Sequence, residues 1–257
     1  MKIRAYLALT VTCVLLLLSD LVQRFVIVPL VWLFPSLRPV VLGRWINVMA
    51  WIVTRPIHHI SGARVPAPLR IIPSKPGVLI LMNHQSLFDI PLVVQAVDGG
   101  YPRIVTRKRY GRWIPLISHM IKLYQYPLVD PTANRTEIRK AFDLVRDAAR
   151  SSEVPFVVFP EGTRTKDGDI GSFRRKGLSG VLSTRPWTVY VLVGDGFWER
   201  PRFKDFLAGL AQVRGRIELA GTLEWTDPEG DTNAFIDKAR GLMVDRLASM
   251  RGEAGIT

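Results

Sequence analysis

Two long apolar stretches dominate the first sixty residues. Ala5 to Leu18 is apolar apart from two threonines, and apolar character resumes from Phe25 to Phe34. Pro29 would kink a helix there, and the prolines that follow would end it. From Val40 to Val53, polar side chains recur every three or four residues, which predicts a helix with one polar stripe on an otherwise apolar surface.

These stretches leave two interpretations open. The fourteen residues from Ala5 to Leu18 are fewer than the roughly twenty that a spanning helix needs. Two helices joined by a proline-containing turn therefore predict a hairpin that dips into one leaflet. A single tilted span from about Ala5 to Phe34 is the alternative. Both interpretations predict a membrane-binding segment at residues 1–60, ahead of a separate domain at 61–257.

From about Gly77 onward, short β-branched runs alternate with helical patterns. Apolar residues recur at helical spacing from Ile138 to Ala149 and from Phe235 to Leu247. This alternation predicts an α/β fold in which helices cover a mostly parallel or mixed sheet. The predicted strands are Val78–Met82, Arg103–Thr106, Tyr126–Val129, Val154–Phe159, Trp187–Val193 and Arg214–Leu223.

The net charge of +13 is unevenly distributed. Residues 1–88, the most apolar third of the chain, contain nine basic residues and a single acidic one, Asp20. Cations beside apolar helices favour anionic lipid headgroups and a location at the cytoplasmic face of the cell membrane. Nucleic acid is the other common partner of a basic protein, but we find no nucleic-acid-binding motif and expect no such partner.

The clearest chemical pattern is Asn83-His84-Gln85-Ser86-Leu87-Phe88-Asp89, directly after a predicted strand. If His84 lies in the turn and Asp89 in the first turn of the next helix, the carboxylate can fix the imidazole tautomer and stabilise the imidazolium. We therefore expect His84 to be a general base, although a turn histidine that caps the next helix has the same local pattern. No nucleophilic side chain is clearly offered, so direct attack by a substrate hydroxyl is favoured.

A second pattern, Phe159-Pro160-Glu161-Gly162-Thr163-Arg164, opens a glycine-rich loop after another predicted strand. Gly162 permits a close backbone approach to a ligand, and its neighbouring amides are candidates to stabilise an oxyanion. Arg164 offers a planar fork that suits phosphate oxygens. An ordinary solvated loop with a Glu161–Arg164 pair is the alternative. Further cations end the loop at Arg174, Arg175 and Lys176.

Five cations also lie between positions 103 and 112, at Arg103, Arg107, Lys108, Arg109 and Arg112. They predict either a lipid-facing basic patch or contacts to substrate phosphates. His58-His59 has no accompanying cluster of acids or cysteines, so we expect no metal site.

The two motifs in this order, roughly seventy residues apart, resemble the glycerolipid acyltransferases of the 1-acylglycerol-3-phosphate acyltransferase type. The resemblance covers about Gly77 to Val193. It implies that His84 is the base, that Asp89 orients it, and that Glu161, Gly162, Thr163 and Arg164 bind the glycerophosphate acceptor. Lys108 also resembles a family lysine.

The implied reaction moves an acyl group from acyl-CoA or acyl-carrier protein to the free hydroxyl of 1-acyl-sn-glycerol 3-phosphate, giving phosphatidic acid, with no further cofactor. Two departures from the family pattern concern the acceptor. Pro131 follows Val129-Asp130 where the family usually has arginine, and Tyr190 to Val193 lacks the usual proline. Another lysolipid, such as a lyso-aminolipid, therefore remains an alternative acceptor, and a non-catalytic lipid-binding protein remains an alternative of another class.

Overall fold

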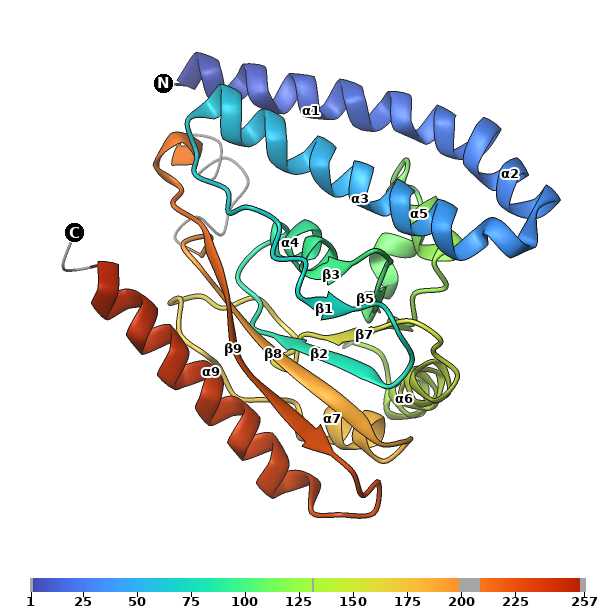
Figure 1. The fold of residues 1–257 in the computed structure, drawn as a ribbon, viewed down its shortest axis with the longest axis vertical. Coiled ribbons are helices and arrows are strands. Elements are labelled where there is room, and N and C mark those ends of the chain that lie inside the picture. The colour runs from blue at the N-terminus through green and yellow to red at the C-terminus, as the bar shows by residue number, and fades with distance from the viewer. Residues whose placement is uncertain (1, 131, 199–208, 255–257) are drawn as a thin grey trace.

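The computed structural model describes residues 2–130, 132–198 and 209–254 (Figure 1). Its centre is a five-stranded sheet with the order β4-β7-β2-β8-β9, in which only the β8–β9 pair is antiparallel. This mixed sheet covered by helices confirms the predicted α/β class. The strands are β2 (Val78–Met82), β4 (Arg103–Ile104), β7 (Phe156–Val158), β8 (Trp187–Asp195) and β9 (Arg216–Trp225).

Helices cover both faces of the sheet because its central strand is apolar on both sides. All five residues of β2 are buried. Successive side chains of a strand point to opposite faces. Ile80 accordingly packs in the cluster that includes helices α3 and α4, while Leu79 and Leu81 pack in the cluster that includes α6, α7 and α9. The covering helices are α4 (Asp89–Ala96), α6 (Arg135–Arg150), α7 (Arg175–Leu182) and α9 (Thr232–Ala254).

Short elements complete the body. Two parallel pairs stand apart from the main sheet, and helix α5 lies close to the N-terminal helices (Figure 1). The predicted strand Arg103–Thr106 is divided between the main sheet and one of these pairs. The additional elements are β1 (Ile72–Pro73), β3 (Val97–Asp98), β5 (Thr106–Arg107), β6 (Leu128–Val129) and α5 (Ile117–Leu123). Of these, β6 lies within the predicted strand Tyr126–Val129, whereas β1, β3 and α5 were not predicted.

The N-terminal apolar stretches form two helical rods that lie side by side (Figure 1). The first rod is α1 (Lys2–Val22), the π-helical turn Gln23–Ile27 and α2 (Val28–Leu33); the second is α3 (Arg38–Pro56), followed by the π-helical turn Ile57–Ser61. Pro29 lacks an N–H group, and the π-helical turn just before it allows the first rod to continue. The helix therefore does not end at residue 18, where the first apolar run stops.

The rods pack on each other and on the body. Arg4 Nε donates to Ile60 O over 2.8 Å, and Trp45 Nε1 donates to Gln23 Oε1 over 2.9 Å. Asp20 and Arg24, four residues apart on the first rod, form an ion pair at 2.9 Å. Buried residues of both rods belong to the same apolar cluster as one face of the sheet. Among the described residues, one helical stretch, Ile3–Leu33, is long and apolar enough to cross a membrane.

Candidate functional site

The two sequence motifs meet at one edge of the sheet. The first begins where β2 ends, and the second begins where β7 ends. These strands are parallel neighbours, with Leu79 opposite Phe156 and Leu81 opposite Val158. Carboxyl ends of adjacent parallel strands lie at the same edge, where such sheets bind ligands. The pairing of these two strands therefore brings together two motifs that are separated by about seventy residues in the sequence.

His84 and Asp89 form a hydrogen-bonded pair. His84 lies in the turn and Asp89 is the first residue of α4. The His84 Nδ1 atom is 2.7 Å from Asp89 Oδ2. The same oxygen accepts the backbone N–H groups of Gln85 at 2.7 Å and Ser86 at 2.8 Å. Asp89 is fully buried. Three donors converge on its Oδ2 atom and hold it in place. The carboxylate in turn fixes the orientation of the imidazole.

The second motif holds His84 from its backbone side. The buried Glu161 carboxylate accepts the His84 N–H at 3.0 Å through Oε1 and the Gly171 N–H at 2.9 Å through Oε2. Thr165 N donates to His84 O over 2.8 Å. Burial raises the pKa of Glu161, and the two backbone donors oppose that shift. Both Glu161 oxygens are thus engaged with backbone donors, which gives this residue a positioning contact with His84.

Two residues that we did not single out fix the same turn from the other side. Asn83 exchanges paired hydrogen bonds with the backbone of Gly194, at 2.9 and 2.8 Å. Gln85 accepts from Phe197 N at 3.2 Å and donates to Asp195 Oδ1 at 3.3 Å. The sequence offered one signal for this role: amide side chains on both sides of His84, directly after an apolar strand. An amide that is buried at such a place needs hydrogen-bond partners.

A cleft of about 120 Å³ opens in front of His84. The His84 ring stacks on Phe159 with ring centroids 4.5 Å apart. The cleft combines apolar walls with a cationic rim. Its apolar lining includes Leu87, Ile90, Ile104 and Val158, and its cationic lining consists of Arg107, Arg109 and Arg164.

Only some of the predicted acceptor-binding residues line this cleft. Gly162 and Arg164 line the cleft, whereas the exposed Thr163 and Lys108 do not. Gly162 has a left-handed φ of 68°, and its N–H donates to Phe159 O over 3.0 Å. That amide is therefore already engaged and is a poor oxyanion donor.

Arginines on either side of Lys108 occupy the cleft instead. Arg107 also donates to Gly162 O over 3.1 Å, which links the basic run to the second motif. Arg175, at the end of the loop, pairs with Asp237 of α9 at 2.5 Å. Val129 lines the cleft, and Pro131, the departure noted in the sequence, lies outside the described residues.

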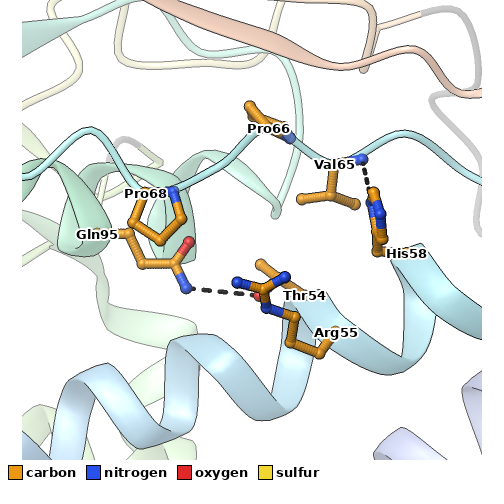
Figure 2. A pocket seen from close by; sticks show the side chains of 7 residues that line it. All are labelled: Thr54, Arg55, His58, Val65, Pro66, Pro68 and Gln95. Carbon is orange, nitrogen blue, oxygen red and sulfur yellow. Dashed lines mark hydrogen bonds between the residues drawn. The ribbon is translucent and has the colours of Figure 1, made fainter.

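A smaller hollow of about 10 Å³ lies between α3 and the chain at 65–68 (Figure 2). His58 Nδ1 accepts the Val65 N–H there over 3.2 Å, and Gln95 donates to Thr54 Oγ1 over 3.5 Å. His58 therefore anchors the chain that leaves α3. No group of three or more potential metal ligands occurs in the part of the chain that the structure describes.

Comparisons with known proteins agree with the motifs. Residues 67–191 match the sequence profile of the family described as Acyltransferase. A protein of Cocos nucifera named 1-acyl-sn-glycerol-3-phosphate acyltransferase is 25% identical over 207 residues, which cover 78% of this chain and 61% of that protein. The chain thus spans less than two thirds of the length of that relative.

The crystal structure of the 1-acyl-sn-glycerophosphate (LPA) acyltransferase PlsC from Thermotoga maritima is similar across almost the whole chain. The TM-score is 0.53 at 18% identity, and the match covers 93% of this chain and 95% of that one. At this identity the likeness shows a shared fold. The resemblance predicted from the two motifs is confirmed by the match of residues 67–191 to the Acyltransferase family profile.

Proposed function

We propose that this protein transfers an acyl group from a thioester donor to the free hydroxyl of 1-acyl-sn-glycerol 3-phosphate at a membrane surface. One observation carries the proposal: the His84–Asp89 pair, closed at 2.7 Å, faces a cleft that has an apolar wall and an arginine rim. An acyl chain suits the wall, and a phosphate suits the rim.

The chemistry follows from which imidazole nitrogen is engaged. Nδ1 of His84 is bonded to Asp89, so Nε2 is the nitrogen that accepts the hydroxyl proton. As that proton leaves, the hydroxyl oxygen forms a bond to the thioester carbonyl carbon. The carbon–sulfur bond then breaks, and the imidazolium returns the proton to the leaving thiolate. The buried Asp89 carboxylate stabilises the imidazolium between these steps, and we expect no cofactor besides the donor.

The acceptor phosphate is assigned to the arginine rim. Arg164 reaches the cleft from the second motif and Arg107 from the basic run at positions 103–112, and the Arg107 contact to Gly162 O holds the two sides together. Guanidinium groups bind phosphate oxygens in pairs, which lysine cannot reproduce. This arrangement favours a phosphate-bearing acceptor over an uncharged one, and it moves the role we assigned to Lys108 onto its neighbours.

Membrane attachment is assigned to the N-terminal rods. The stretch Ile3–Leu33 has 31 residues, which at about 1.5 Å per residue reach beyond a hydrocarbon core of about 30 Å. Exposed apolar side chains such as Phe25 and Trp32 favour lipid as their surroundings. The basic flanks favour the cytoplasmic leaflet.

The test is incubation of the purified protein with a panel of lysolipids and with both acyl-CoA and acyl-carrier protein, followed by mass spectrometry of the products. We expect phosphatidic acid from 1-acylglycerol 3-phosphate, and His84→Ala as the matched control should give none above background. Preference for a lysolipid without phosphate would overturn the acceptor assignment. Absence of product from every acceptor would overturn the reaction itself.

A further inference from the structure

The segment from residue 107 to residue 117, here called the basic loop, connects the cleft to the N-terminal rods. It carries Arg107, Lys108, Arg109 and Arg112, and the sequence has no acidic residue between Asp98 and Asp130. At one end, Arg109 and Tyr110 line the cleft beside His84.

The other end of the basic loop is fastened to α1. Leu116 N donates to Asp20 Oδ1 over 2.8 Å, and His119 Nδ1 is 3.2 Å from the same oxygen. In Figure 1 the green chain before α5 reaches up to α1. Neighbours of Asp20 on α1 are apolar and open, since Leu17 is 57% and Leu21 is 53% exposed. The basic loop thus lies at the border between the cleft and the apolar surface of the first rod.

Trp113 stands out within this loop. Its side chain is 96% exposed, and its φ of 64° is a left-handed value that bulky residues rarely adopt. Leu116 has a similar φ of 60°, but its side chain is buried and its N–H is bonded to Asp20. Packing therefore accounts for the backbone strain at Leu116 and not for that at Trp113. A strained backbone that presents an indole to the surroundings points to a partner that covers it.

We propose that the basic loop docks on an anionic lipid bilayer, with Trp113 in the headgroup layer and Arg112 against lipid phosphates. Indole side chains prefer the membrane–water interface, and cations near it are attracted to anionic lipids. The proposal rests on the membrane location in the proposed function but concerns a contact separate from the N-terminal rods. It places the mouth of the cleft at the bilayer, so that a lysolipid enters past Arg109 and Tyr110 without crossing bulk water.

A fluorescent reporter at position 113 tests the contact directly. Cys13 is first replaced by serine, and Trp113→Cys is then labelled with an environment-sensitive dye; Leu144→Cys on α6, where Leu144 is 61% exposed, is the matched control. With vesicles that contain phosphatidylglycerol, we expect a blue shift and quenching by headgroup-level spin-labelled lipid at position 113 only. Equal signals at positions 113 and 144, or no vesicle binding at all, would overturn the proposal.

Kinetics supply a second measurement on the unlabelled chain. An indole has on the order of 200 Å² of surface, and removing about a quarter of it from water at ~25 cal/mol per Å² changes partitioning nearly tenfold. Trp113→Ala should therefore raise KM for a bilayer-embedded lysolipid about tenfold. Its kcat, and its rates with a monomeric short-chain acceptor, should match those of Leu144→Ala. Equal losses with both acceptors, or none, would contradict docking. If the wild type transfers to no acceptor, the proposed function fails while the reporter still tests docking.

Discussion

Replacing Asp89 with asparagine should separate the charge of this residue from its geometry. Three donors converge on Asp89 Oδ2, namely His84 Nδ1 and the backbone N–H groups of Gln85 and Ser86. Oδ1 is buried without a hydrogen-bond partner among the described residues. The asparagine amide therefore keeps its oxygen at the Oδ2 position, because the reverse orientation would set an NH₂ group against two backbone donors. His84 consequently keeps its tautomer.

At His84, Asp89→Asn replaces an ionic hydrogen bond by a neutral one; the bonds from the two backbone N–H groups become neutral as well. Bonds to a charged group are worth about 1.5–3 kcal/mol and neutral ones about 0.5–1.5, so the loss is about 1–2 kcal/mol. This corresponds to roughly a five- to thirtyfold fall in kcat. His84→Ala should cost about a hundredfold to ten-thousandfold. Asp89→Ala should in addition unfold at lower temperature, because two buried N–H groups lose their acceptor.

The assay is thiol release from acyl-CoA with saturating acceptor, together with thermal unfolding in detergent. Full activity in a folded Asp89→Asn protein would show that Asp89 does not act on His84. A loss as large as that of His84→Ala, with unfolding unchanged, would refute the argument that the backbone donors preserve the tautomer.

Three further predictions concern the cleft, the Glu161 contact to His84 and the attachment of the basic loop to α1. Arg164→Ala should lower kcat/KM for a phosphate acceptor about ten- to a hundredfold and should lower kcat/KM for monoacylglycerol far less. Lys108→Ala should change neither value. Equal effects of the two substitutions would contradict the assignment of Arg164 to the cleft. Glu161→Gln loses one of two backbone acceptors and should cost about 1–3 kcal/mol of unfolding free energy in chemical denaturation. Because burial raises the Glu161 pKa above its ordinary 4.5, the wild type gains stability from protonation below that value and loses it as pH rises through the raised pKa; the glutamine variant should lack this dependence. Asp20→Ala leaves the Leu116 N–H without its acceptor and should speed hydrogen exchange there; unchanged protection would show that the loop is held by other contacts.

The sequence by itself determined the class of fold and the position of the His84–Asp89 pair after strand β2. Strand β2 was predicted at its observed bounds, because five consecutive apolar residues suit a strand that is buried on both faces. The spacing of His84 and Asp89 predicted contact if one residue lay in the turn and the other in the first turn of the helix, and the structure places them so. Each of the two family motifs is likewise a short run of consecutive residues. Short-range pattern carries this information because turn, strand and first helical turn are all set by neighbouring residues.

Tertiary structure decided which side chains face the site. Three arginines line the cleft, whereas the family resemblance implied Lys108; the direction of a side chain in a short helical turn depends on what packs against it. Glu161 was expected to bind substrate, and its two oxygens bind the backbone at His84 and Gly171, a contact made across the pairing of β2 with β7. The N-terminal rods, likewise, share one apolar core with the sheet. Contacts between residues far apart in the chain depend on the packing of whole elements, and no local pattern encodes that packing.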